Sequence, residues 1–118
     1  MNAIRDAIHD LFNRPELTVD EAADRHFDPA FRQRVNGALI DRQAFIDGIE
    51  QLKARVMHAH VHVLDEVVAG TRYAERHVIE LVMRDGESVR QEVFLFGELA
   101  TDARFVRIEE VTLSLANT

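Results

Sequence analysis

Three charged side chains, Asp65, Arg76 and Glu80, stand among valines and alanines in two segments whose apolar and polar residues alternate. Alternation with a period of two is typical of a β-strand that buries one face. A charge on such a face has to be paired or functional, because burying an isolated charge costs much free energy. These residues are therefore candidates for a polar site inside an apolar pocket, where acid–base chemistry is favoured.

The dipeptide Gly70-Thr71 separates the two segments and predicts a hairpin. A two-residue turn there, or a four-residue loop, opposes Asp65 to Arg76. One face of the hairpin then carries small, apolar and charged side chains: Ala59, Val61, Val63, Asp65, Val67, Ala74, Arg76, Val78, Glu80 and Val82. We expect this face to line the inside of the fold. The opposite face, which carries three histidines, is expected to lie outside.

A second hairpin is predicted at Asp85-Gly86, and the length of its loop decides which residues face Val78. A two-residue loop places the next apolar valine and leucine there. A three-residue loop with a bulge places Glu92, Phe94 and Phe96 there instead. In that case Glu92 joins the polar group and the two phenylalanines line an apolar ligand site, although such residues are more often ordinary core.

His58, His60 and His62 alternate along one predicted strand. Their rings project from one face with a spacing of roughly 6.6 Å between neighbours. Two neighbours could share a metal ion, but the first and third lie about 13 Å apart, too far for zinc bonds of about 2 Å. We expect no metal site here. A row of histidines at an edge or a dimer face is the simpler interpretation, and a pH-sensitive interface would follow from it.

Apolar residues at helical spacing predict three helices in the first half of the chain. The first ends before Pro15, the second begins at Thr18 with Glu21 completing a capping box, and Asp41 caps the third. A short strand is expected at 31–36, and four long strands at 58–69, 72–84, 88–98 and 104–115. The order predicts a single α+β domain over residues 1–118, with the helices on one face of a curved, mainly antiparallel sheet.

Composition narrows the classes of partner. The chain of 118 residues has 14 basic and 21 acidic residues, a net charge of −7, which disfavours nucleic acid and anionic membranes as partners. It has no cysteine, no apolar signal segment and no apolar stretch long enough to cross a membrane. We expect a cytoplasmic protein. Because both hairpin faces are apolar, we also expect a homodimer through the outer face of the sheet.

The order of elements resembles the nuclear transport factor 2-like superfamily, and within it the SnoaL-like (polyketide-cyclase-like) domains. The local marks are His-Phe-Asp-Pro-Ala-Phe at 26–31, Glu-Val-Val-Ala-Gly-Thr-Arg-Tyr-Ala-Glu-Arg-His at 66–77 and Ala-Arg-Phe-Val-Arg-Ile-Glu-Glu at 103–110. The resemblance covers nearly the whole chain. It implies a cone-shaped pocket between the helices and the concave sheet, which binds a small apolar molecule.

The same resemblance implies a set of site residues. Arg76 matches the arginine of the epoxide-hydrolase branch, and Glu110 matches its acid on the last strand. The second acid of that branch falls on Val78, so the relay is incomplete. Arg34 stands where cyclase-like members carry a histidine, and we expect it at the pocket mouth.

Two functions are compatible with these residues. The first is a cofactor-independent acid–base enzyme of isomerase, cyclase, dehydratase or epoxide-hydrolase type, in which Glu110 transfers a proton and Arg76 orients it or stabilises negative charge. The second is a non-catalytic module that binds a ligand in the pocket or another protein on the outer face.

Overall fold

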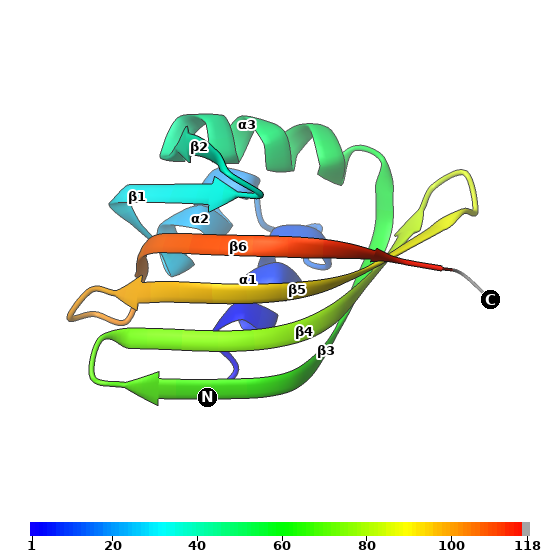
Figure 1. Cartoon of the computed structure of the whole chain (residues 1–118). Helices are drawn as coiled ribbons and strands as arrows, with labels where there is room; N and C mark the ends of the chain where they lie inside the picture. The colour runs from blue at the N-terminus through cyan, green and yellow to red at the C-terminus, as the bar shows by residue number, and fades with distance from the viewer. Residues whose placement is uncertain (117–118) are drawn as a thin grey trace.

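The computed structural model describes residues 1–116 and contains three helices and six strands (Figure 1). Their order is α1 (Ala3–Phe12), α2 (Val19–His26), β1 (Phe27–Val35), β2 (Ala38–Asp41), α3 (Arg42–Lys53), β3 (Val56–Ala69), β4 (Arg72–Met83), β5 (Ser88–Leu99) and β6 (Phe105–Leu115). The predicted α+β architecture is confirmed, with the helices on one face of a curved sheet. None of the helices in residues 1–116 has the length and apolar character needed to span a membrane.

Local sequence signals set the helix boundaries. In the predicted capping box of α2, Glu21 N donates to Thr18 Oγ1 at 3.0 Å and Thr18 N donates to Glu21 Oε1 at 3.1 Å. Helix α3 begins after Asp41, whose carboxylate accepts from Ala44 N at 2.9 Å. These bonds satisfy backbone N–H groups that have no partner within a helix. Helices α2 and α3 therefore start where the sequence predicts.

The sheet has the strand order β2-β1-β6-β5-β4-β3. Strands β1 and β6 pair in parallel and the other neighbours are antiparallel. Strand β2 was not predicted. It forms a hairpin with β1 through Asn36 and Gly37, which have φ angles of 49° and 89°. Asn-Gly with positive φ at both residues is the preferred two-residue hairpin turn, so the signal was present in the sequence.

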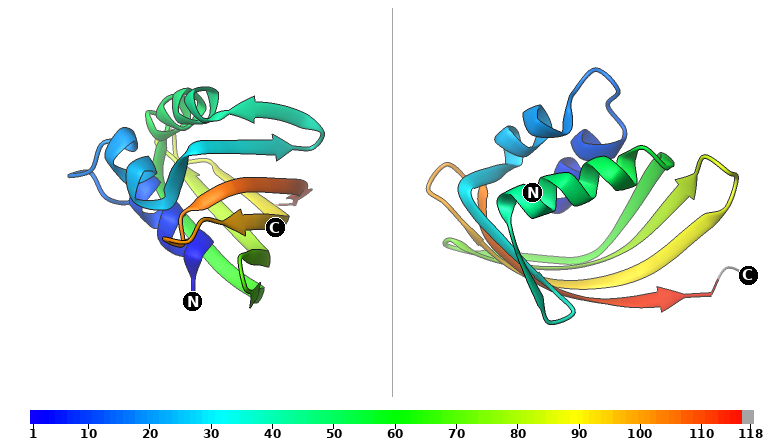
Figure 2. Two further views of the ribbon diagram at one scale, coloured as in Figure 1. Left: turned by 90° about the vertical axis from the view of Figure 1, so that its left-hand side faces the viewer. Right: turned by 90° about the horizontal axis from the view of Figure 1, so that it is seen from above.

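The long strands curve around the helices, which fill the concave side of the sheet (Figure 2). The core lies between these two layers. Four phenylalanine rings pack together where β1, α3 and β6 meet, with centroids 4.7 to 5.9 Å apart: Phe27, Phe31, Phe45 and Phe105. Beside this cluster, aliphatic side chains of β4 and β5 line the cavity described below, together with residues of β1, β6, α1 and α3.

A bulge in β3 changes which β3 residues share a face with Arg76. Asp65 pairs with Arg76 as expected, but Val63 pairs with His77 rather than with Val78, because the register shifts between Val63 and Asp65. Such a shift moves the β3 side chains beyond the bulge to the other face, so the valines at 61 and 63 lie on the His77 face. The choice of the face with Arg76, Val78 and Glu80 as the inner one was wrong. On β4 the concave side carries Tyr73, Glu75, His77, Ile79, Leu81 and Met83.

Candidate functional site

A cavity of about 200 Å³ lies between the helices and the concave side of the sheet. Its walls are mainly aliphatic and aromatic, and helices α1 and α3 close it from above. Four polar side chains from the sheet reach it, namely Gln33, His77, Gln91 and Glu110. An apolar cavity with a few convergent polar groups is the usual form of a small-molecule site.

Strand register brings two carboxylates close together on the concave face. Glu75 of β4 and Glu110 of β6 both pair with Leu95 of β5, so all three lie in one row across the sheet. Strand spacing of about 4.8 Å puts the two backbones roughly 10 Å apart. His77 follows Glu75 by two residues on the same face, in the next row. Three titratable groups therefore share the concave face here.

Glu75 and His77 form a buried pair. His77 Nδ1 lies 2.6 Å from Glu75 Oε1, and the side chains are 3% and 0% exposed respectively. A carboxylate bound to Nδ1 fixes the ring orientation and its tautomer, which leaves Nε2 available towards the cavity. Among the described residues, Glu75 Oε2 has no hydrogen-bond partner. Glu75 thus depends on His77 to compensate its charge.

Glu110 is the second polar group at the cavity. Gln33 Nε2 donates to Glu110 Oε1 at 2.8 Å. Burial raises the pKa of the Glu110 carboxyl above its ordinary value, and the charge of Glu75 acts in the same direction, while the Gln33 hydrogen bond and His77 partly oppose the shift. A carboxyl whose pKa is raised by burial exchanges protons more readily near neutral pH than an exposed one.

Helix α1 is fixed over the cavity by a polar cluster at its N-terminus. Ala3 N donates to Glu66 Oε2 at 3.2 Å, and the Tyr73 hydroxyl donates to the same carboxylate. Burial and the Glu66 carboxylate raise the pKa of Tyr73, so this hydroxyl stays protonated. A carboxylate at a helix N-terminus is favourable for the helix dipole. The cluster therefore holds the helix whose residues Ile4 and Leu11 line the cavity.

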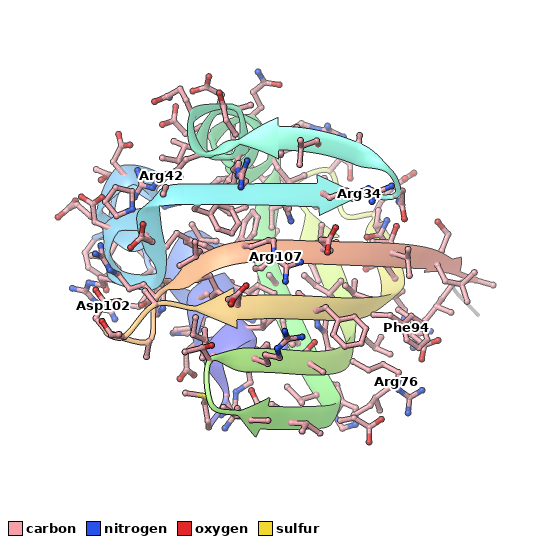
Figure 3. The ribbon with its side chains drawn as sticks, turned by 60° about the vertical axis from the view of Figure 1, so that its left-hand side comes forward. Arg34, Arg42, Arg76, Phe94, Asp102 and Arg107 are labelled. Atoms are coloured by element: carbon pink, nitrogen blue, oxygen red, sulfur yellow. The ribbon has the colours of Figure 1, made fainter. Side chains whose placement is uncertain are left out.

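Arg76, Asp65, Glu92 and Phe94 lie on the convex face, away from the cavity. Arg76 forms ion pairs of 3.0 Å with Asp65 and with Glu92, and its guanidinium carbon lies 5.8 Å from the centroid of the Phe94 ring. Figure 3 shows Arg76 and Phe94 near one another, on the side of the sheet that the helices do not cover. The structure therefore does not bring Arg76 and Glu110 together.

The remaining predicted residues also lie on the convex face. Glu92 pairs with Val78, as the bulged alternative for the second hairpin predicts, and Phe96 is 69% exposed. Glu80 is opposite His60, and Arg34 is 3.7 Å from the Glu109 carboxylate. Of the predicted site residues, Glu110 alone lines this cavity.

Glu75, His77, Gln33 and Gln91 were missed by sequence reasoning. The alternation of Tyr73, Glu75, His77, Ile79 and Leu81 includes the larger side chains of β4 and is a signal for the buried face. The bulge at Leu64, which no local motif predicts, puts the valines at 61 and 63 on the His77 face, whereas the parity argument groups them with Arg76.

The three histidines of β3 lie along the edge strand of the sheet. The rings of His58 and His60 have centroids 4.2 Å apart. Within residues 1–116 no cluster of three or more histidine and acidic side chains has the arrangement of a metal site. His60 and His62 pair with Glu80 and Val78 on the convex side of the edge strand.

No family model matches the sequence, and no curated protein matches it at the sequence level. Solved structures do match. A nuclear transport factor 2-like protein of unknown function from Exiguobacterium sp. 255-15 has a TM-score of 0.71 and 18% identity over 95% of this chain and 98% of its own. An epoxide hydrolase of the LEH-like type from M. tuberculosis has a TM-score of 0.73 and 14% identity over 94% and 80%.

A third similar structure contains a small molecule. It is a hypothetical protein with a ketosteroid isomerase-like fold from Catenulispora acidiphila, in complex with trimethylamine, with a TM-score of 0.70 and 10% identity over 92% of this chain and 83% of its own. The similarities establish that this chain has the nuclear transport factor 2-like fold, as its sequence resemblance implies.

Proposed function

We propose that this domain is a small-molecule enzyme of SnoaL-like type that performs cofactor-independent acid–base chemistry in the cavity beneath the helices. The observation that carries the proposal is the placement of His77 and Glu110 at one apolar cavity, with Glu75 bound to the far side of the His77 ring. Arg76 has no part in this chemistry, because its ion pairs lie on the convex face.

His77 and Glu110 take complementary roles in the proposed reaction. Glu75 accepts the Nδ1–H of His77, so Nε2 accepts a proton from the ligand, and Glu75 stabilises the imidazolium that forms. Glu110, whose pKa is raised by burial, exchanges a proton with the polar group of the ligand. Glu75 is a positioning residue, since it acts through His77.

The size of the cavity supports a small substrate. An engineered apolar cavity of about 150 Å³ in another protein holds benzene. A cavity of about 200 Å³ therefore suits a single ring or a short branched chain better than a polycyclic molecule. The complex of the Catenulispora protein with trimethylamine is consistent with a fold that takes small molecules.

Solvent-deuterium exchange tests the proposal without knowledge of the product. A panel of monocyclic ketones, epoxides and amines is incubated with the protein in D₂O, returned to H₂O so that N–H and O–H positions lose their deuterium, and analysed by mass spectrometry for deuterium at carbon or for hydration. We expect turnover of at least one class, and losses of about 100-fold or more in His77→Asn and Glu110→Gln, the size typical of general acid–base groups. Glu75→Gln should lose activity and shift the pH profile.

Glu109→Gln is the matched control, because Glu109 is adjacent in sequence but pairs with Arg34 and Arg107 on the convex face. It should retain full turnover. Equal turnover in wild type, His77→Asn and Glu110→Gln would disprove the proposed roles.

The alternative function is a binding module that uses the convex face. Exposed apolar side chains gather there on three strands, β3, β5 and β6: Val67, Phe94, Phe96, Val111 and Leu113. Exposed apolar patches of this kind usually mark interfaces. We propose that a second copy of the chain covers this patch, so that the domain is a homodimer whose two cavities open away from the interface.

A further inference from the structure

The charge of the cavity restricts its ligand. Among the residues that line it there is no lysine and no arginine. Its titratable groups are Glu110 on β6 and His77 on β4, with Glu75 directly behind His77. The helices contribute apolar side chains alone, such as Ile8, Leu11 and Phe45, and β1 and β5 add the neutral amides of Gln33 and Gln91.

With Glu75 ionised, the Glu75–His77 pair gives the cavity wall a net charge that is either negative or zero. With a protonated ring the pair is neutral, and with a neutral ring it carries one negative charge. An ionised Glu110 adds another. No lysine or arginine at the cavity wall is available to hold an anionic ligand, because the convex-face arginines are bound to acids on the other side of the sheet, and a positive charge on His77 is already paired with Glu75.

We propose that the cavity selects a small cationic ligand, a monocyclic amine bound as its ammonium with Glu110 as its counter-ion. The inference rests on the proposed function and names its substrate class. Gln33 occupies Glu110 Oε1, while Oε2 has no hydrogen bond to any described residue. An ammonium group donates to that oxygen, and its charge offsets the cost of keeping the carboxylate in an apolar site.

The apolar walls determine the rest of the molecule. A ring that carries the ammonium fills the space between the leucine and isoleucine side chains of α1, α3, β4 and β5. His77 Nε2 then lies beside the ring of the ligand, where it is the proton acceptor of the proposed reaction. A ligand of the same shape that carries a carboxylate would instead lie beside the negative charge of Glu110, and no lysine or arginine lines the cavity to compensate the two charges.

Three ligands that share one ring separate these possibilities: benzylamine, benzyl alcohol and benzoate. Their dissociation constants are measured calorimetrically with the wild-type protein at pH 7.5. We expect benzylamine to bind at least about tenfold more tightly than benzyl alcohol, as a charge-assisted hydrogen bond requires, and benzoate to bind most weakly. The preference for the amine should disappear in Glu110→Gln and persist in Glu109→Gln.

The outcomes distinguish this inference from the proposed function. If benzyl alcohol binds as tightly as benzylamine, or benzoate binds most tightly, the cavity is a ligand site and the amine assignment is wrong. The same holds if Glu110→Gln keeps the preference. If none of the three binds, the proposed function and the amine assignment both fail. If Glu110→Gln does not fold, the relative affinities of the three ligands for the wild-type protein still test the amine assignment.

Discussion

Burial of Glu110 links the site to stability. Because burial disfavours its ionised form, the folded pKa lies above the ordinary value of 4.5. The folded state then binds more protons than the unfolded state between these two values, so stability falls as pH rises through that window. Glu110, to which we assign a catalytic role, therefore destabilises the fold at neutral pH.

Glu110→Gln tests this relation. We expect a higher melting temperature than wild type at pH 7, since the amide removes the buried charge and keeps the shape. Each kcal/mol would appear as about 4 °C in a domain of this size. The difference should shrink as pH falls below 4.5. Melting curves from pH 4 to pH 8 measure it, with Glu109→Gln as control, and a variant that is less stable than wild type at pH 7 would contradict this view of Glu110.

At the scale of elements, the capping signals were sufficient to place the starts of α2 and α3. Thr18, Glu21 and Asp41 each make the hydrogen bond that their position predicts. The sheet was harder, because pairing depends on register and a single bulge reverses the faces. Glu110 could be assigned to the site through the family resemblance. Glu75 and His77 could not, because parity separates the two faces of β4 but does not show which of them lies inside the fold.

Thr18→Ala should lower stability by about 1 kcal/mol. The change leaves Glu21 N at the start of α2 without its acceptor and removes half of the capping box. Urea denaturation measures the loss. Thr71→Ala, in the exposed β3–β4 turn, is the control and should change stability by less than about 0.5 kcal/mol. A Thr18→Ala effect no larger than that of the control would refute the contribution of the cap.

Two glycines should respond to alanine in opposite directions. Gly48 lies on the exposed side of helix α3, and a Cβ there would meet nothing within 4 Å. Gly48→Ala should therefore stabilise the folded protein by about 1 kcal/mol. On β5, a Cβ on Gly97 would lie 3.1 Å from Phe105 Cε1. Because that ring is buried in the aromatic cluster, Gly97→Ala should destabilise by about 1–3 kcal/mol. Thermal unfolding of both variants measures this, and the same sign in both would contradict it.

At the scale of the whole molecule, the two faces of the sheet have different functions in our proposals. The concave face holds the cavity, and the convex face carries ion pairs and exposed apolar side chains. Phe96→Glu should dissociate the proposed homodimer, because it puts a charge into the centre of the apolar patch. Sedimentation velocity measures the mass of the particle in solution. Val89→Glu is the control, because Val89 lies on the same strand but on the opposite face, and this variant should remain a dimer. A monomeric wild-type protein would rule the dimer out.

The central claim is that ligands bind in the cavity beneath the helices. Methyl-resolved NMR of the protein with benzylamine tests it most directly, because both faces of the sheet carry methyl groups. We expect shifts at Ile79, Leu81 and Ile108, which line the cavity, and none at Val67, Val111 and Leu113 of the convex face. Shifts confined to the convex-face methyl groups would contradict the claim and place the binding surface on the other side of the sheet.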